Sequence, residues 1–430
     1  MNYQECLDYL YSQLPMFQRV GAPALKYDLS NTVALMSAIG DPHLKFPTVH
    51  IAGTNGKGSS AHAISAILTS AGFTTGLFTS PHLSSFAERM RIDGTPAAEA
   101  IVTDFVNHHQ NLIERIKPSF FEMTFAMSMS YFADSEIDIA IIETGLGGRL
   151  DSTNVVQPEV CLITSIGLDH TELLGDTLDK IASEKAGIIK ANVPVVIGAD
   201  QPDILHVFAD AANKQRAPLH QSLDIEISII QAERTAVSVD VFYHNHQRFK
   251  DLKLDLPARY FLKNIPGVIK TIDCLVDLGW KITEEDIASG LSNVQSKSGL
   301  KGRFQVLQEV PLTVADISHN LPGITELVNQ LMHIKYDKLH IVFGAVRDKK
   351  LDQMLKTLDK TGGKFYFTQS GVPRALPSLE LQDLAHSLNI KGDSYSNVNE
   401  ALNHVRDFAD SNDMILICGS TFVVAEIEGL

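Results

Sequence analysis

The sequence predicts an α/β fold with a mainly parallel sheet and a small antiparallel section, followed by a second, Rossmann-like domain. Apolar runs of strand length alternate with helical patterns along most of the chain, which is typical of parallel sheets. A glycine-rich segment at residues 50–60 lies between a short apolar strand and a helix. With 430 residues the chain is also too long for one ordinary core, so we expect two domains.

The glycine-rich segment HIAGTNGKGSS is suited to holding phosphate. Its glycines allow positive φ and let backbone N–H groups approach anionic oxygens; they are Gly53, Gly56 and Gly58. Lys57 adds a mobile cation, and the positive end of the helix that follows faces the same place. The segment is not a strict Walker A motif, because Ile51 stands at the first glycine position and Gly58 separates Lys57 from Ser59.

The alternation continues through the first domain. We expect helices over residues 59–72 and 176–187 and strands over residues 137–142, 160–166 and 193–198. Ligands of open parallel sheets bind beyond the carboxyl ends of the strands, where Lys57, Glu143 and His170 would meet. Alternating apolar and polar residues from about 224 to 255 predict an antiparallel hairpin.

A polar, glycine-containing stretch, Ser296–Gly302, marks the predicted boundary between a first domain of residues 1–297 and a second of residues 298–430. The second domain is of ordinary size. Its expected strands are Leu312–Ile317, Leu339–Ala345, Lys364–Gln369 and Met414–Ser420.

Composition excludes several functional classes. The formal net charge of −15 argues against general binding of nucleic acids or anionic membranes, because no basic field attracts polyanions. The four cysteines are far apart and form no CxxC pair, which predicts reduced core residues in a cytoplasmic protein. The N-terminus has no signal-peptide pattern, and no run approaches the ~18 apolar residues of a membrane span.

An ordered series of motifs resembles the folylpolyglutamate synthase family, whose members are often also dihydrofolate synthases. The motifs are HIAGTNGKGSS, FTSPHL (78–83), FFEMTFAMSMSYF (120–132), ETGLGGRLDSTN (143–154), ITSIGLDHTELLG (163–175) and SEKAGIIK (183–190). GRF at Gly302, PRA at Pro373 and GSTFVVAE near the C-terminus extend the resemblance over nearly the whole chain. It implies a Mur-ligase-like P-loop ATP-binding domain and a C-terminal domain that contributes to ATP and glutamate binding.

The resemblance implies an ATP-dependent amide ligase. ATP would phosphorylate the tail carboxylate of a reduced folate, or of dihydropteroate, and the amine of L-glutamate would attack the acyl phosphate. A carboxylate is a poor acyl donor until its oxygen becomes a good leaving group, and fixed cations must neutralise the phosphoryl transfer. The family also implies a monomer with small-molecule substrates, while the cysteines and the charge predict a cytoplasmic protein with neither nucleic acid nor membrane as a partner.

Residue roles follow from the matching motif positions. Catalytic roles fall to Lys57, Glu143, His170, Lys185 and His319. ATP would contact Gly53, Thr54, Asn55, Gly56, Lys57, Gly58, Ser59, Asn264, Arg303 and Asp316. The folate side comprises Ser80, Pro81, His82, Phe121, Glu122, Leu150, Asp151 and Ser152. Two Mg²⁺ sites, which Mn²⁺ could also fill, would use Ser80, Glu143, His170 and Lys185, the lysine as a carbamate made from CO₂.

Plainer explanations stay open for the charged residues. An isolated Glu143 is also compatible with a surface carboxylate, and His170 with a hydrogen-bonded loop histidine. Lys185 near a helix end also suits an ordinary surface charge. Arg149, which follows GLGG, equally fits a structural ion pair.

The aromatic pair Phe120 and Phe121 has a plainer explanation too, since such pairs belong more often to a core than to a ligand platform. Glu122 and Asp151 are therefore the better candidates for reading the edge of a pterin.

The second-domain motifs depart from the family pattern. The usual DGAHNP is DISHNLPG here, which keeps Asp316, His319 and Asn320. The usual HQxxNA is residues 260–265, which keep Asn264 but lose the glutamine that lies near adenine. GAVRDKK (344–350) ends in lysine where an acid is more usual.

These departures keep two alternatives open. One is a diverged paralogue that binds nucleotide and folate with little turnover. The other is a Mur-type ligase that joins amino acids to a cell-wall nucleotide, although TSPHL and GLGGRLDSTN favour folate.

Overall fold

The computed structural model describes residues 1–15, 28–347 and 351–430. The chain forms two compact units. The first unit comprises Met1–Ala232, Ala236–Asp255 and Phe261–Leu300, and the second unit comprises Glu233–Thr235, Leu256–Tyr260 and Lys301–Leu430. Residues 348–350 of the GAVRDKK motif lie outside the described residues.

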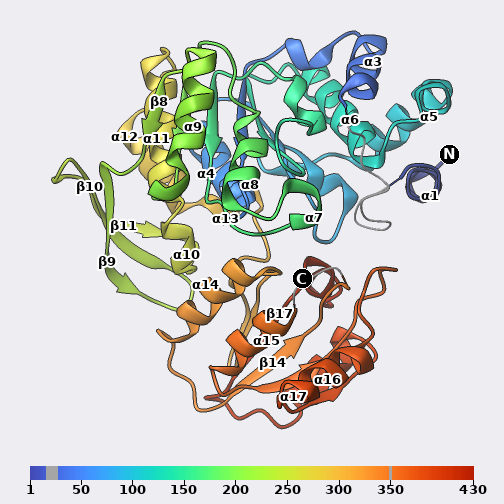
Figure 1. Ribbon diagram of the computed structural model, residues 1–430, viewed down its shortest axis with the longest axis vertical. Coiled ribbons are helices and arrows are strands. Elements are labelled where there is room, and N and C mark those ends of the chain that lie inside the picture. The colour runs from blue at the N-terminus through green and yellow to red at the C-terminus, as the bar shows by residue number, and fades with distance from the viewer. Residues whose placement is uncertain (16–27, 348–350) are drawn as a thin grey trace. The chain divides into compact units, whose positions relative to one another are not determined.

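The first unit contains an eight-stranded, mainly parallel sheet (Figure 1). Its strands are β1 (Thr48–Ala52), β2 (Thr75–Phe78), β3 (Met90–Ile92), β4 (Thr95–Pro96), β5 (Ile139–Glu143), β6 (Val160–Ile163), β7 (Val195–Ile197) and β8 (Leu219–Gln221). Their order is β4-β3-β2-β5-β1-β6-β7-β8, and only β3 and β4 run antiparallel to their neighbours. The predicted fold class is therefore confirmed.

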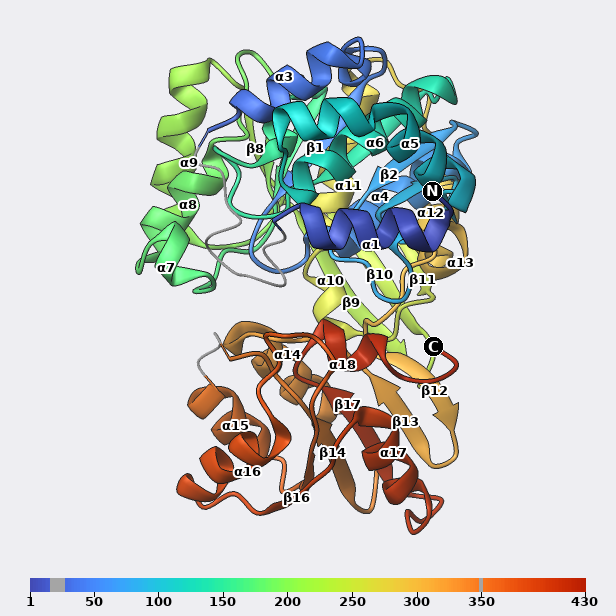
Figure 2. The ribbon, with the colours of Figure 1, turned by 90° about the vertical axis from the view of Figure 1, so that its right-hand side faces the viewer.

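Helices cover both faces of this sheet, as its fully buried central strands require (Figures 1 and 2). One face packs against α4 (Lys57–Ser70) and α11 (Ile265–Asp277), and α12 (Glu284–Ser292) and α13 (Val294–Ser298) pack on α4. The other face carries two apolar clusters, built with α1 (Tyr3–Gln13), α3 (Ser30–Ala38), α5 (Glu99–Ile116), α6 (Phe120–Asp134), α8 (Leu178–Ala186) and α9 (Pro202–Gln215).

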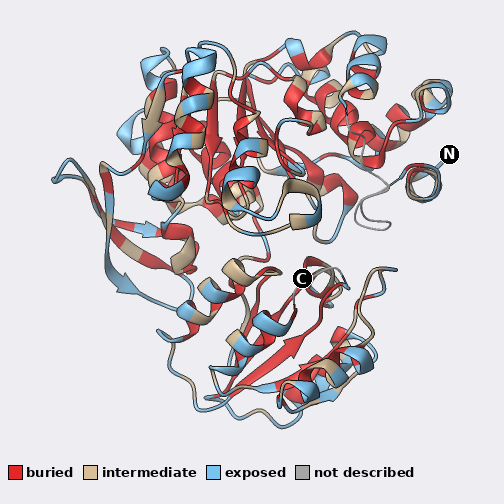
Figure 3. Ribbon diagram, in the orientation of Figure 1, coloured by how far each residue is buried: buried red, intermediate tan, exposed pale blue. Residues whose placement is uncertain are grey.

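Short helical turns complete the unit. They are η2 (Pro42–Leu44), η3 (Phe86–Arg89), η4 (Ser152–Val155), α7 (Thr171–Leu174) and α10 (Arg259–Leu262), the last of which spans the point where the chain leaves the second unit. The burial pattern shows the sheet strands as the innermost layer (Figure 3).

The predicted hairpin over residues 224–255 is instead a separate sheet of three antiparallel strands. They are β9 (Ile225–Ala232), β10 (Val237–Tyr243) and β11 (His246–Leu254), in the order β11-β10-β9. The hairpin between β10 and β11 turns at His244 and Asn245, which both have positive φ, as a tight two-residue turn requires. The prediction recognised the alternation but not the two turns that divide it.

The second unit contains a six-stranded sheet in the order β12-β13-β17-β14-β15-β16. All four predicted strands are present, as β13 (Leu312–Ala315), β14 (Leu339–Phe343), β15 (Lys364–Phe367) and β17 (Met414–Cys418). The prediction missed the edge strands β12 (Gln305–Glu309) and β16 (Gly392–Ser394). The helices are α14 (Leu321–Leu331), α15 (Leu351–Asp359), α16 (Ser378–Ser387), α17 (Val398–Arg406) and α18 (Thr421–Ala425).

Two further sequence predictions can be compared with the structure. The four cysteines are free and buried, which confirms that they are core residues outside any disulfide. Among the helices of residues 1–15, 28–347 and 351–430, none is long and apolar enough to cross a membrane.

Candidate active site

The glycine turn between β1 and α4 lies at the carboxyl end of the first sheet's central strand. Gly53 has φ 154° and Gly56 has φ 89°. A Cβ on Gly53 would lie 1.8 Å from Thr164 Oγ1, and one on Gly56 would lie 2.4 Å from Asn264 Oδ1. Both positions therefore require glycine, for backbone conformation and for space.

The turn is fastened to the segment that follows β6. The Thr54 N–H donates to Ser165 O at 2.7 Å, and Thr164 Oγ1 donates to Asn55 O at 2.8 Å. Thr54 Oγ1 also donates to Gly167 O at 3.1 Å. These bonds hold the backbone of the turn in place before any ligand binds.

Two lysines converge on the carbonyl group of Gly53. Lys57 Nζ donates to Gly53 O at 3.1 Å and to Thr54 O at 3.2 Å, while Lys185 Nζ donates to Gly53 O at 2.6 Å. Lys185 is 4% exposed. Burial and the charge of Lys57 lower the pKa of Lys185 to about 7, although the nearby carboxylates act in the opposite direction. The turn thus concentrates positive charge at the N-terminus of α4.

Glu143, the last residue of β5, lies beside the first turn of α4. It is 5% exposed, and its Oε2 accepts the Ser80 N–H at 3.1 Å. A Cβ on Gly58 would lie 3.5 Å from the same oxygen. The structure therefore brings two predicted metal ligands, Ser80 and Glu143, together at this helix start.

The donors at this place suit a hard divalent cation. Glu143 provides a carboxylate and Ser80 a hydroxyl group, and oxygen donors of these kinds are the ones that Mg²⁺ prefers. The described residues contain no group of three or more His, Cys, Asp and Glu that could hold a metal by themselves. A metal here would therefore need the hydroxyl group or further oxygen donors besides the carboxylate.

His170, another predicted ligand, precedes α7 with φ 50°. The backbone N–H of His170 donates to Asp169 Oδ1 at 2.9 Å, and its ring Nε2 lies 3.9 Å from Asp169 Oδ2. Asp169 also acts on the pKa of Lys185, so this carboxylate lies near the lysine. His170 as a metal ligand stays a prediction.

The predicted folate-side aromatic residue is half-buried. The ring of Phe121 lies 5.7 Å from that of Phe78, and Gly145 approaches it so closely that a Cβ would lie 2.6 Å from Phe121 Cζ. Phe120, in contrast, is 2% exposed and stacks on Tyr11 at 5.4 Å between centroids. Phe120 is a core residue.

The two carboxylates predicted to read a pterin edge are engaged in local turns. Glu122 Oε2 accepts the Ser119 N–H at 2.5 Å, which caps α6. Asp151 accepts the Leu146 N–H at 2.7 Å and the Thr153 hydroxyl at 2.6 Å. Burial raises the pKa of Asp151, and these hydrogen bonds oppose the rise. Both residues shape the backbone here, whatever ligand they meet.

The other folate-side residues lie on two loops. Pro81 is exposed, and the half-buried members are Ser80, His82, Leu150 and Ser152. Arg149 forms an ion pair with Glu184 at 2.9 Å, so the structural explanation for this arginine is correct.

The sequence prediction did not include Glu88 and Arg89, which organise the loop that carries His82. Arg89 is 1% exposed and donates its Nε–H to His82 Nδ1 at 2.8 Å. Burial and the charge of Arg89 lower the pKa of His82 to about 3. Glu88 accepts the backbone N–H groups of residues 83–85. Charged residues inside the apolar stretch 86–92 are the signal that points to them.

In the second unit, several residues gather around Asp316, which follows β13. Its carboxylate accepts the N–H groups of Phe304 and Ser318, both at 2.8 Å, and the hydroxyl groups of Tyr260 and Ser318. Burial and the charge of Asp316 raise the pKa of Tyr260, while Arg303 acts in the opposite direction. Two residues that depart from the family motifs, Tyr260 and Ser318, therefore both bond to the retained aspartate.

The remaining second-domain candidates lie at the start of α14 and in the first unit. His319 Nδ1 lies 3.0 Å from Ile317 O, and Asn320 caps α14 by accepting the Gly323 N–H at 2.9 Å. Asn264 lies in the first unit, against Gly56.

Comparison with known proteins identifies the family of this chain. The Mur ligase middle domain matches residues 51–272, and the Mur ligase glutamate ligase domain matches residues 302–421. The dihydrofolate synthase/folylpolyglutamate synthase of Bacillus subtilis (strain 168) is 32% identical over 436 residues, which cover 99% of this chain and 98% of that protein. The chain belongs to the folylpolyglutamate synthase family.

Solved structures of folylpolyglutamate synthases agree with this membership. E. coli FolC in complex with DHPP and ADP has a TM-score of 0.85 and 26% identity, and the match covers 99% of this chain and 96% of that one. The bifunctional folylpolyglutamate synthase/dihydrofolate synthase of Yersinia pestis CO92, complexed with AMPPNP and Mn ion, has a TM-score of 0.85 and 29% identity, with 99% and 97% covered. Both of these relatives were solved with an adenine nucleotide or its analogue, and the Yersinia pestis protein also with a manganese ion.

Proposed function

We propose that this chain is an ATP-dependent ligase that adds L-glutamate to the tail carboxylate of reduced folates. The carboxylate would take the γ-phosphoryl group of ATP to give an acyl phosphate. The amine of glutamate would then displace phosphate and form the amide, with ADP as the other product. The observation that carries the proposal is the glycine turn, on which Lys57 and Lys185 converge beside Glu143.

The residues of the turn have separate tasks in this proposal. The backbone N–H groups at the start of α4 and the ammonium group of Lys57 would hold the ATP phosphates and stabilise the negative charge of the transferring group. Because the hydrogen bonds from the β6 side fix the turn in advance, little reorganisation is needed when ATP binds.

We assign the predicted functions to the predicted domains. Residues 1–297 would bind ATP and folate, and residues 298–430 would add ATP and glutamate contacts, including Arg303, Asp316 and His319. The folate would contact the residues predicted on the folate side.

Glu143 and Ser80 would hold Mg²⁺, with His170 and Lys185 completing two metal sites. When bound, the metal neutralises charge on the phosphoryl oxygens. Lys185 would serve as a carbamate, because CO₂ addition replaces a buried cation next to Lys57 with an anion. Intact mass and ¹³CO₂ labelling test this modification, and an unmodified amine in an active, metal-loaded protein would contradict it.

The decisive assay combines ATP and glutamate with each pteroate acceptor and follows ADP release and product mass. We expect ADP release only when folate and glutamate are both present. Nucleotide binding without turnover would instead favour the diverged paralogue. Turnover with a cell-wall nucleotide acceptor in place of folate would favour the other Mur-type ligase.

We also propose dihydropteroate as a second acceptor, because the Bacillus subtilis relative is named for both activities. The same assay measures it. Finally, we propose a cytoplasmic monomer that acts on small molecules only; light scattering in solution tests the oligomeric state.

A further inference from the structure

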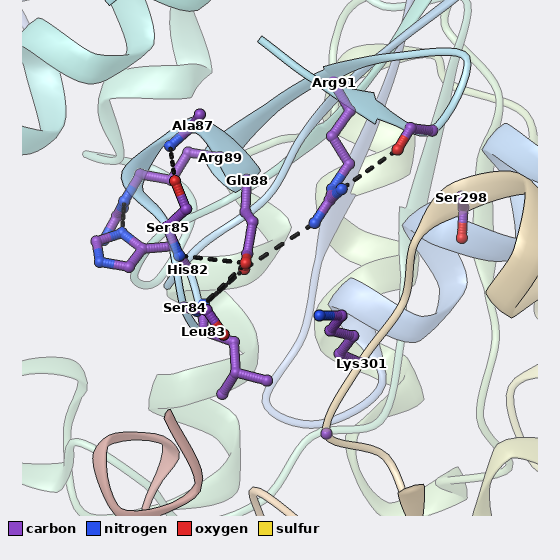
Figure 4. Close-up of polar contacts among 12 residues, drawn as sticks. His82, Leu83, Ser84, Ser85, Ala87, Glu88, Arg89, Arg91, Ser298 and Lys301 are labelled. Atoms are coloured by element: carbon purple, nitrogen blue, oxygen red, sulfur yellow. Dashed lines mark hydrogen bonds and ion pairs between the residues drawn. The ribbon is translucent and has the colours of Figure 1, made fainter. Parts of the chain in front are cut away.

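We infer that Arg89 is a positioning residue that keeps His82 Nδ1 as a hydrogen-bond acceptor, so that the ring hydrogen lies on Nε2 and His82 presents a hydrogen-bond donor to the folate acceptor. The inference deepens the proposed function, on which the identity of the ligand rests. Figure 4 shows the two side chains and the loop between them.

The direction of one hydrogen bond fixes the form of the imidazole. Arg89 Nε–H lies 2.8 Å from His82 Nδ1, and a guanidinium N–H can only donate. His82 Nδ1 must therefore accept, which excludes both the imidazolium and the form with hydrogen on Nδ1. The hydrogen of the neutral ring is then on Nε2.

The arginine that imposes this form is itself held in place. Arg89 is 1% exposed, and its guanidinium carbon lies 5.2 Å from the centroid of the Phe120 ring. The ring of Phe86 packs against the imidazole of His82 at 6.2 Å between centroids. A buried guanidinium that lies over an aromatic ring has little freedom to change partners, so the donor to His82 is held in place.

Glu88 fixes the backbone on the other side of the imidazole. Its carboxylate accepts the N–H of Leu83 at 2.9 Å, of Ser84 at 3.3 Å and of Ser85 at 3.2 Å, as the dashed lines in Figure 4 show. The ring of His82 and the backbone that follows it are therefore both tied to the turn η3. The direction of Nε2–H is set before a ligand arrives.

The chemistry of the ligand atom follows from this arrangement. His82 Nε2 makes no hydrogen bond to any residue within the described ranges. As a fixed donor it would recognise a carbonyl or carboxylate oxygen, or a ring nitrogen, of the folate. It could not take a proton from the glutamate amine, because its one accepting nitrogen is occupied by Arg89.

Nuclear magnetic resonance of ¹⁵N-histidine-labelled protein tests the form of the ring directly. We expect the His82 signals, identified by their loss in His82→Gln, to show a pyridine-like Nδ1 and a pyrrole-like Nε2. In Arg89→Met we expect averaging between the two neutral forms. A pyrrole-like Nδ1 in the unchanged protein would overturn the inference.

Arg91→Met is the matched control. Arg91 is another buried arginine, two residues further on, and it shares the Glu88 carboxylate at 4.0 Å and donates to Gly94 O at 3.2 Å, but it does not bond to His82. Its loss should leave the His82 signals as they are in the unchanged protein. An equal change in both variants would mean that Arg89 acts only by general packing.

A double-mutant cycle tests the role in binding. Arg89→Met should raise the folate KM about tenfold, which is the loss of one good hydrogen bond, and leave the ATP KM unchanged. In a His82→Ala background the same substitution should add nothing, whereas additive effects would show that Arg89 does not act through His82. If no pteroate acceptor is turned over at all, the proposed function fails, while the ¹⁵N spectra still decide whether Arg89 positions the ring.

Discussion

Lys57 and Lys185 donate hydrogen bonds to one acceptor, the carbonyl oxygen of Gly53, at 3.1 and 2.6 Å. Two ammonium groups so close to each other repel, and the buried one also loses its hydration. The arrangement is therefore costly in the absence of ligand and becomes favourable when an anion binds. A nucleotide should accordingly raise the thermal stability of this protein.

Removing the cation of the turn should affect catalysis far more than folding. We expect Lys57→Ala to lower kcat by about 10²–10³-fold, because a cation near the γ-phosphate acts mainly in the transition state. Steady-state ADP release measures this, with circular dichroism to show that the fold is retained. Lys214→Ala, which removes an exposed lysine of α9, is the control and should retain full turnover. Near-normal turnover of Lys57→Ala would remove the turn from the mechanism.

Lys185 should make stability depend on pH. Its folded-state pKa of about 7 lies below the ordinary 10.5, so the unfolded chain binds more protons between these values. The free energy of unfolding is therefore lowest below pH 7, where the buried lysine is charged. It rises by about a few kcal/mol as the pH increases toward 10.5, because the folded protein then holds the lysine neutral. We expect Lys185→Met to be more stable than the unchanged protein at pH 6, with a gap that narrows at pH 9.

Urea denaturation of both proteins in CO₂-free buffer without nucleotide measures this gap. A difference in unfolding free energy that stays constant with pH would show that Lys185 is not charged in a buried environment.

The glycine at the start of the turn should tolerate no side chain. Gly53→Ala would place its Cβ 1.8 Å from Thr164 Oγ1, so we expect weaker ATP binding and lower stability. Adding Thr164→Ala should recover only part of the loss, because φ 154° remains unfavourable for alanine. Gly72→Ala is the control: it has φ 87° but nothing within 4 Å of the new Cβ, so it isolates the backbone cost. Isothermal calorimetry with ATP and thermal denaturation check these outcomes, and full rescue would contradict the backbone argument.

The hydroxyl of Tyr260 should contribute to stability through Asp316. Tyr260→Phe removes one donor from a carboxylate that is 1% exposed, and we expect a loss of about 1–3 kcal/mol in unfolding free energy. Tyr336→Phe, also in the second unit, is the control, because the Tyr336 hydroxyl forms no hydrogen bond with any of the described residues. An equal decrease in unfolding free energy in the two variants would mean that the hydrogen bond from Tyr260 to Asp316 does not stabilise the fold.

The sequence predicted the buried strands well and the edges poorly. β5 and β17 are runs of five buried, mostly apolar residues. A short run of this kind is typical of a strand in the interior of a parallel sheet. β12 and β16 are partly exposed edge strands with little apolar pattern, and their pairing depends on neighbours distant in sequence. The sequence predicted one hairpin in place of the three-stranded sheet of β9 to β11, because an alternating pattern does not show where the chain turns.

The site was predictable where one local segment makes it. The glycine turn and the strand ends can be read from consecutive residues. Arg89 stands out in the sequence only as a charged residue beside apolar ones, and its role could not be assigned there, because that role depends on its spatial partner His82. Likewise the donors to Asp316 include Tyr260, which is 56 residues away along the chain.

The second unit includes the short segment Leu256–Tyr260, which lies in the sequence between two segments of the first unit. Pro257 O accepts from Gln330 Nε2 at 3.1 Å, and Gln330 Oε1 accepts from the Arg259 N–H at 2.8 Å. A polypeptide started at Lys301 would lack these partners and leave Gln330 and Asp316 short of donors and acceptors. An exchange of C-terminal domains between related proteins would therefore give a stable domain only if Leu256–Tyr260 were exchanged together with it.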